Sequence, residues 1–201
     1  MPHFEPILPV GGSFYNLNDR LPFGSYGIAR LNPGGDLDAG FRILNNVSVY
    51  ALAVQSDAKI LIGQNSYLGA SFTNNISRLG TNGLPDVSFA AAAANGIIRA
   101  IALQPDGKIL VGGSFTNLGG FSKKYLGRLS SAGTVDTSFT ADANAPVSVL
   151  AVQRDGRILV GGTFSILAGQ ARSRIARLNA DGALDPGFSP VADGEVQTIT
   201  L

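Results

Sequence analysis

The sequence predicts an all-β fold built from four similar units, and three observations lead to that prediction. The chain of 201 residues repeats itself with a period of about fifty residues. Units contain two runs of β-branched residues joined by an Asp-Gly turn, the strongest local signal for a β-hairpin. No segment carries a sustained apolar stripe at the helical period of 3.6 residues, and glycine recurs every few residues.

The repeat is set by an Arg-Leu pair that occurs four times, at intervals of 48, 50 and 49 residues. Each arginine is followed by an aspartate eight residues later and by a phenylalanine eleven residues later. These triplets are Arg30, Asp38 and Phe41; Arg78, Asp86 and Phe89; Arg128, Asp136 and Phe139; and Arg177, Asp185 and Phe188. A period of this length is typical of solenoids, propellers and other repeat arrays.

Each unit is predicted to be a four-stranded antiparallel meander, as the fourth unit illustrates. Its first two strands are SVLAVQ and RILVGGTF, and the Arg-Asp-Gly turn between them joins them. Two further short runs follow, RIARLN and ALDPGF, and Gly182 lies in the turn between them. The other units place Gly35, Gly83 and Gly133 at this turn, where the backbone needs a positive φ.

The first strand of each unit has large side chains on one face and small ones on the other. Leu52 and Val54 alternate with Ala51 and Ala53, for example. Sheets that stack around an axis need this pattern because their innermost strands are crowded on both sides. A lone sheet cannot bury both faces, and each large side chain left in water forfeits roughly 1.5 to 3 kcal/mol. We therefore expect a β-propeller of four four-stranded antiparallel blades.

The unit boundaries predict one repeat domain, residues 1–201, whose first blade is divided between the two ends of the chain. The expected blades are residues 1–46 plus 195–201, residues 47–95, residues 96–145 and residues 146–194.

The two ends of the sequence are complementary. Val196 to Leu201 aligns with a first strand, whereas Leu8 to Phe14 aligns with a second strand, so a velcro closure between them is expected. Two arrangements satisfy it: a four-bladed ring in one chain, or two chains that exchange ends in an eight-bladed ring. The third possible arrangement is an open part of a larger ring. Because Pro9 cannot donate to a ladder, this seam is expected to be the weakest joint.

Composition argues against several classes of partner and site. Only 14% of residues are charged and the net charge is +1, so no nucleic-acid partner is expected. No apolar run approaches the roughly 20 residues that span a bilayer, so no membrane insertion is expected. The chain has no cysteine, its one histidine is His3, and no phosphate-binding glycine motif occurs. No cofactor, metal site or catalytic residue is predicted.

The phrases QPDGKILVGGSF (residues 104–115) and RLNADGALDPGF (residues 177–188), with their copies, resemble the bacterial delta-60 repeat family. The resemblance covers nearly the whole chain. It implies propeller blades in large bacterial proteins, often extracellular or at the cell surface, and no common enzymatic activity. Ala58 departs from the pattern by replacing a turn glycine, and the second unit lacks the Gly-Ser-Phe phrase.

Residues that recur in every unit are interpreted as scaffold. The aspartates of the triplets are expected to accept turn amides or to pair with the arginines, and the phenylalanines to pack within the blades.

Candidate binding residues lie where the units differ. One aligned position near the start of the innermost strand holds a different residue in each unit: Tyr50, Arg99, Ser148 and Gln197. We expect this column of residues to line one mouth of the axial channel. The alternative is that they are four unrelated residues that face solvent. The loops after the Gly-Gly phrase carry four aromatic residues that either bind a partner or cover the blades: Tyr15, Tyr67, Phe121 and Tyr125.

The predicted function is therefore a non-enzymatic module that binds a protein or glycan, or a structural scaffold in a bacterial surface or secreted protein. A homodimer formed by strand exchange is part of this prediction. The alternative is a hydrolase or lyase acting on carbohydrate with paired carboxylates, Asp36 with Asp38 or Asp181 with Asp185.

Overall fold

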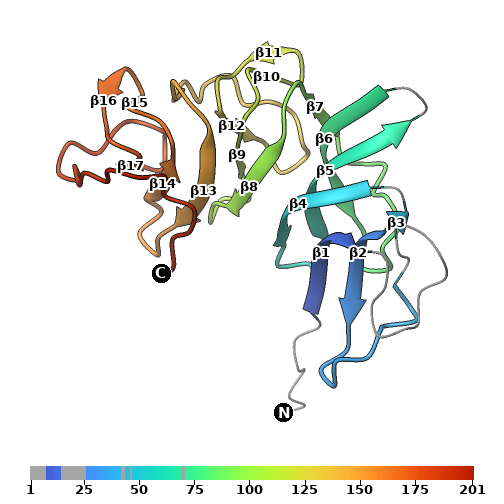
Figure 1. The fold of residues 1–201 in the computed structure, drawn as a ribbon. Coiled ribbons are helices and arrows are strands. Elements are labelled where there is room, and N and C mark those ends of the chain that lie inside the picture. Colours follow the sequence, from blue (N-terminus) through green and yellow to red (C-terminus); the bar gives the residue numbers. More distant parts are fainter. Residues whose placement is uncertain (1–7, 15–25, 42–43, 46, 69–70) are drawn as a thin grey trace.

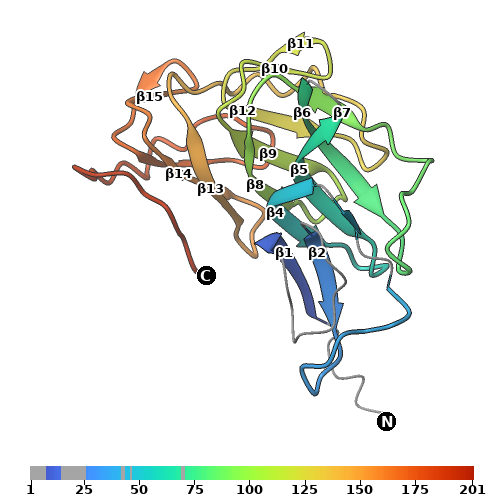
Figure 2. The same ribbon diagram turned by 45° about the vertical axis from the view of Figure 1, so that its right-hand side comes forward.

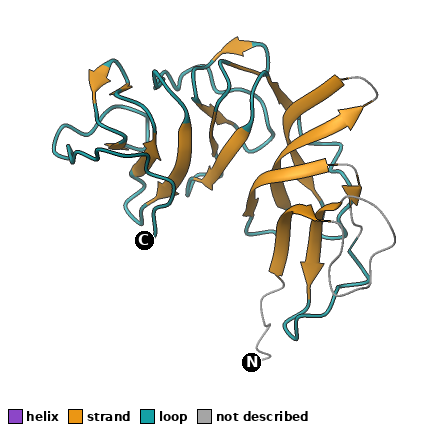
Figure 3. Ribbon diagram, in the orientation of Figure 1, coloured by secondary structure: helices purple, strands orange, loops and turns teal. Residues whose placement is uncertain are grey.

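The computed structural model describes residues 8–14, 26–41, 44–45, 47–68 and 71–201 of the chain. All regular secondary structure in these ranges is β-strand, in agreement with the predicted all-β class (Figure 3). The described residues contain no helix long and apolar enough to cross a bilayer.

The sheets follow the four sequence units in order (Figure 1). Blade 1 contains β1 (Leu8–Phe14), β2 (Tyr26–Leu31) and β3 (Leu44–Asn45). Blade 2 contains β4 (Val47–Val54), β5 (Ile60–Leu68), β6 (Ser71–Leu79) and β7 (Ala92–Ala94). Blade 3 contains β8 (Ile98–Leu103), β9 (Ile109–Gly113) and β12 (Leu126–Leu129). Blade 4 contains β13 (Val147–Val152), β14 (Ile158–Gly162) and β17 (Ile175–Leu178).

Two small hairpins follow the Gly-Gly phrases of blades 3 and 4. They are β10 (Asn117–Leu118) with β11 (Phe121–Ser122), and β15 (Ile166–Leu167) with β16 (Gln170–Ala171). The first hairpin pairs with β7 and so extends the sheet of blade 2 to six strands.

The predicted first hairpin is present in blades 2, 3 and 4. In each case the last residue of the first strand pairs with the first residue of the second strand, as Val152 does with Ile158. Gly107 and Gly156 adopt the left-handed φ values of +82° and +83° in these turns, and Ala58 has a φ of +61° at the same place. The Asp-Gly signal therefore located these turns correctly.

The prediction of four strands in every blade is not confirmed. The segment ALDPGF, expected as a fourth strand, contributes only an isolated bridge between Leu184 and Leu178. The chain instead turns there, because the amide of Asp185 bonds the carbonyl of Arg177 and the amide of Phe188 bonds the carbonyl of Asp185. In blade 2 the fourth strand is β7, beyond the equivalent turn.

The predicted closure is also not seen, because the sheets do not close into a ring. Figures 1 and 2 show the blades along an open arc, with β1 near one end and the C-terminal segment at the other. Among the described residues β1 pairs only with β2. Residues 196–201 form no strand, although the amide of Val196 donates to the carbonyl of Gly162 (3.2 Å).

The core is divided into three clusters that lie between adjacent sheets, as expected if neither face of a blade can remain in water. Each cluster contains the phenylalanine of one triplet and the isoleucine that begins the second strand of the following blade. The three pairs are Phe41 with Ile60, Phe89 with Ile109, and Phe139 with Ile158.

Candidate functional site

The four Arg-Asp-Phe triplets share one geometry. The guanidinium Nε of Arg128 donates to Asp136 Oδ2 (2.9 Å), and its Cζ lies 4.6 Å from the ring centre of Phe139. The second carboxylate oxygen of Asp136, Oδ1, accepts a hydrogen bond from the amide of Ser138 (3.0 Å). The other three triplets repeat the ion pair, the turn amide and the cation–π contact. The side chains thus have the contacts expected of scaffold residues.

The triplets also join neighbouring blades, which the sequence did not indicate. Arg78 Nη1 donates to the carbonyl of Ser131 (2.9 Å), and Arg128 Nη1 donates to the carbonyl of Ala180 (2.8 Å). Arg30 reaches the carbonyl of Thr81 in the same way. Each of these three guanidinium groups therefore fixes a turn of its own blade against a turn of the next.

These contacts keep the triplet carboxylates ionised. The amide of Gly40, followed by Arg30, lowers the pKa of Asp38, and Gly187 with Arg177 does the same for Asp185. A hydroxyl contributes most in the other two triplets, where Ser88 and Ser138 lower the pKa values of Asp86 and Asp136.

The four residues of the variable column lie together in the structure. Tyr50, Arg99, Ser148 and Gln197 line one hollow of about 370 Å³, together with Glu195. We call this set of five residues the mouth hollow. Tyr50, Arg99 and Ser148 lie in the innermost strands β4, β8 and β13. Glu195 and Gln197 lie near the C-terminus, outside any strand.

A β-bulge explains why these side chains share a direction. In β4, Val49 pairs with Gln64 and Ala51 pairs with Gly63, so Tyr50 is an extra residue without an opposite partner. The register shifts at the equivalent positions of blades 3 and 4, where Arg99 and Ser148 are the extra residues. Bulges re-aim a side chain relative to the regular alternation of a strand, and they are common next to binding sites.

Glu195 connects the polar side of the mouth hollow. The hydroxyl of Ser148 donates to Glu195 Oε1 (2.6 Å), and Gln197 Nε2 donates to Oε2 (3.3 Å). Ser148, Gln197 and the positive charge of Arg99, in that order, lower the pKa of Glu195. Tyr50 is half-exposed at the same hollow. The hollow therefore combines an aromatic face, a cation and an ionised carboxylate.

Glu195 was missed by the sequence analysis, although a signal was present. It is one of only two glutamates in the chain, and it lies two residues before Gln197. The equivalent positions in the other units hold Ser48, Ile97 and Pro146, so this position varies like the column beside it.

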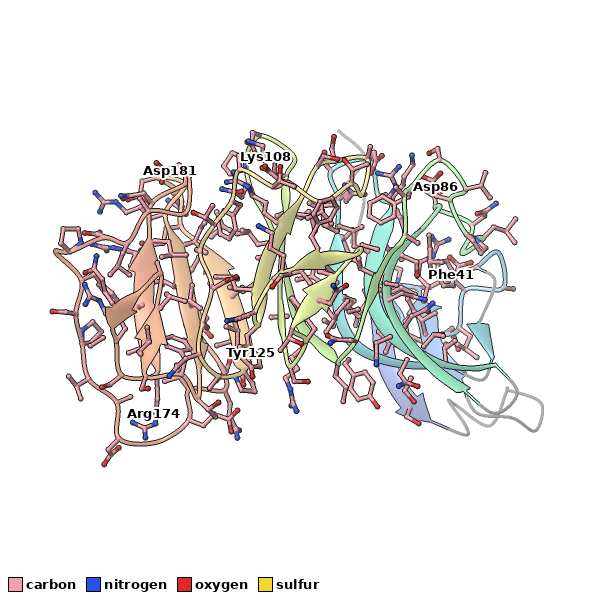
Figure 4. The ribbon with its side chains drawn as sticks, turned by 90° about the horizontal axis from the view of Figure 1, so that it is seen from above. Phe41, Asp86, Lys108, Tyr125, Arg174 and Asp181 are labelled. Carbon is pink, nitrogen blue, oxygen red and sulfur yellow. The ribbon has the colours of Figure 1, made fainter. Side chains whose placement is uncertain are left out.

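Phe121 and Tyr125, the loop aromatics whose side chains are described, do not line the mouth hollow. Phe121 is exposed in β11, and Tyr125 is partly buried against the core between blades 3 and 4 with a φ of +65°. Figure 4 shows Tyr125 and Arg174 along one edge of the sheets, whereas Asp86, Lys108 and Asp181 lie along the opposite edge. Tyr15 and the side chain of Tyr67 lie outside the described residues.

The carboxylates considered for catalysis are engaged in turns. Asp38 and Asp185 bind their triplet arginines, and Asp181 Oδ1 accepts the amide of Ala183 (2.9 Å). Within the described ranges, no group of three or more His, Cys, Asp or Glu side chains is arranged to hold a metal ion.

One protein family matches residues 10–41, 104–139 and 153–188, which together are just over half of the chain. The family is described as a domain of unknown function (DUF5122) β-propeller. This chain belongs to it. The DUF5122 match confirms the predicted β-propeller class, whereas the delta-60 resemblance stays a prediction.

Two solved structures are similar to this DUF5122 chain in shape. A Bacteroides caccae protein of unknown function is 10% identical, covers 81% of this chain and 74% of its own, and has a TM-score of 0.46. The extracellular domain of a putative one-component system from B. thetaiotaomicron is 14% identical with a TM-score of 0.32. That alignment covers 75% of this chain and 26% of the other. No curated protein matches in sequence.

Proposed function

We propose that this DUF5122 chain is a non-enzymatic module of a bacterial surface or secreted protein, and that it binds a glycan in the mouth hollow. One observation carries the proposal. The column in which the units differ is also the column that three β-bulges direct into a shared hollow. A rigid frame with variable residues at one place is how repeat scaffolds acquire specificity.

The chemistry of the mouth hollow suits a sugar better than a purely apolar or purely charged ligand. A sugar ring has an apolar face that packs on an aromatic side chain such as Tyr50, and hydroxyls that both donate and accept. Arg99 supplies donors, and the ionised Glu195 supplies acceptors. A volume of about 370 Å³ lies within the range of small-molecule sites.

The proposal includes the closure of the blades into a ring. The blades surround a common axis, and the ring is completed when Val196–Leu201 becomes the innermost strand beside a β1 strand, whether of the same chain or of a second copy. The mouth hollow then lies at one end of the axial channel.

The test is binding to an immobilised panel of neutral and acidic bacterial oligosaccharides. The double variant Tyr50→Ala and Arg99→Ala is expected to bind at least about tenfold more weakly than the parent protein, because it loses the aromatic face and a charged hydrogen-bond donor. Phe121→Ala is the matched control, since it removes an exposed aromatic residue outside the hollow.

Two outcomes contradict the proposal. If Phe121→Ala weakens binding and the double variant does not, the loops bind the ligand instead. If no member of the panel binds the parent protein, the glycan assignment is wrong.

The hydrolase alternative is less well supported. A general acid needs a raised pKa, whereas Asp38 and Asp185 have lowered pKa values. The same panel tests this alternative, because release of reducing sugar that is lost on replacement of Asp36 or Asp181 would restore it.

A further inference from the structure

Adjacent blades meet through a joint with recurring parts. In the first part, an aliphatic side chain of an innermost strand sits over a glycine of the preceding blade. An added Cβ on Gly112 would lie 2.7 Å from Val147 Cγ1, and one on Gly63 would lie 2.6 Å from Ile98 Cγ2. Only glycine therefore allows the two strands to approach this closely.

The second part is the triplet arginine, which donates to a carbonyl in the next blade, as described above. The third part is the triplet phenylalanine, which packs on the turn glycine of the next blade. A Cβ on Gly133 would meet the ring of Phe89 at 2.8 Å, and one on Gly182 would meet the ring of Phe139 at 2.6 Å. We call these three contacts the blade joint.

Blade 4 presents half of a further blade joint. Val196 Cγ1 lies 2.7 Å from a Cβ placed on Gly161, so the C-terminal segment already occupies the position of an innermost strand. Within the described part of the chain, however, Val196–Leu201 is not paired in a sheet.

The triplet of blade 4 also lacks its interblade contacts. Arg177 keeps Asp185 and Phe188 but reaches no carbonyl of a following blade among the described residues. Its side chain is 20% exposed, compared with 5% for Arg128 and 11% for Arg78. Phe188 is partly exposed, whereas the other three triplet phenylalanines are buried.

Blade 1 presents the complementary half. The residue that begins the second strand is buried in the other blades, with at most 2% exposed for Ile60, Ile109 and Ile158. The equivalent residue, Leu8, is 58% exposed. The turn of blade 1 matches the turns used by the internal joints, since Gly35 has a φ of +86°, compared with +91° for Gly133 and +102° for Gly182.

We propose that the open face of blade 4 binds blade 1 of a second copy of this chain, head to tail. By the register of β13 with β14, Val196 pairs with Gly12 of the second copy, Ile199 with Val10 and Leu201 with Leu8. Arg177 then donates to the Pro33 carbonyl, and Phe188 packs on the turn of residues 32–35.

A second copy fits better than the same chain because β1 and the C-terminal segment lie apart on the open arc in both views (Figures 1 and 2). Two chains that each offer both halves can form two identical joints. This head-to-tail assembly closes as a dimer when a half turn relates the two chains, whereas another rotation would give a larger ring or a filament. The arginine contact occurs three times within the chain, and the phenylalanine–glycine contact occurs at least twice.

The joint has a consequence for the mouth hollow, and this consequence alone rests on the proposed function. Pairing of Val196 with Gly12 and of Thr198 with Gly11 leaves Gln197 as an extra residue, as in the three bulges of the chain. The second copy thereby fixes the direction of Gln197 toward the hollow.

Cross-linking of single-cysteine variants tests the joint directly, because the natural chain has no cysteine. Leu8→Cys and Leu201→Cys are mixed and treated with a short bismaleimide. We expect a covalent dimer in the mixture and little or none with either variant alone. A mixture of Val87→Cys with Leu201→Cys is the control, since Val87 is fully exposed and lies outside the joint.

Sedimentation velocity supplies the second measurement. The parent protein is expected at twice the mass of the chain, and Leu8→Lys at the mass of one chain, whereas Val87→Lys remains a dimer. The proposal is overturned if the parent protein is a monomer at every concentration. It is also overturned if the double variant Leu8→Cys and Leu201→Cys cross-links only within one chain. Glycan binding is not used in either measurement, so failure of the joint and failure of the proposed function are distinguishable.

Discussion

At the scale of single residues, the triplet arginine connects its own blade to the next. Arg128 bonds Asp136 and the carbonyl of Ala180, and it covers the ring of Phe139. The spacing in the sequence predicted the contacts within one blade, because they lie between residues eight and eleven positions apart. The contact with Ala180 could not be predicted in this way, since it depends on how one blade is placed against the next.

Replacement of this arginine is expected to destabilise the protein strongly. Arg128→Ala should lower the free energy of unfolding by about 3 kcal/mol, because removing one partner of a nearly buried ion pair leaves the other partner uncompensated. Urea denaturation measures the change. Arg154→Ala, at an exposed position, should change it by less than about 0.5 kcal/mol, and equal effects of the two variants would contradict the assignment.

The triplet aspartates predict an acid-sensitive stability. Their pKa values are lowered in the folded protein, whereas an unfolded aspartate titrates near about 3.9. Between these values the unfolded chain binds more protons, so stability is fully present above about pH 4 and falls as the pH is lowered further.

The urea midpoint should therefore change little for these groups between pH 7 and pH 5 and decrease below about pH 4. Asp136→Asn should show a shallower decrease than the parent protein, because one titrating group is lost. A midpoint that stays constant down to pH 2 would show that these carboxylates do not contribute to stability.

At the scale of elements, the repeated strands were predictable and their irregularities were not. The alternation of large and small residues and the Asp-Gly turns correctly placed β13 and β14. The segment ALDPGF was expected as a strand because it follows the turn at Gly182, but Asp185 organises a turn there. The bulges leave no separate mark in the sequence, because one extra residue is recognised only when both strands are aligned.

The glycines of the second strands provide a test of how closely the blades pack. Gly112→Ala should destabilise the protein by about 1 to 3 kcal/mol, since the new methyl group would lie 2.7 Å from Val147 in a packed core. Gly194→Ala is the matched control, because a Cβ there meets no atom within 4 Å. Thermal or urea denaturation compares the two. A neutral Gly112→Ala variant would indicate that the blades are free to move apart.

At the scale of the whole molecule, the sequence predicted blades that bury each other's faces, and the three interblade clusters have that form. It did not decide how the arc closes. That arrangement depends on small rotations between successive blades, and no short motif records such a rotation. The variable column was located from the sequence alone, whereas Glu195 was recognised only from its bonds to Ser148 and Gln197.

The proposed joint predicts that hydrogen exchange depends on protein concentration. Amides of residues 197–201 should exchange rapidly in dilute solution, because these residues form no strand within their own chain, and more slowly when the second copy pairs with them. Exchange measured by mass spectrometry on either side of the dimer transition detects the difference. Peptides from β14 should show equal protection at both concentrations, and no change in residues 197–201 would contradict the prediction.

The bulge in each innermost strand has an evolutionary consequence. Val49 faces the core while the neighbouring Tyr50 faces the hollow, so a substitution at residue 50 leaves the packing between blades in place. Under the proposed function, ligand preference can change through single substitutions at these positions, because they lie outside the interblade clusters. Duplication of a blade then adds one more adjustable position to the site.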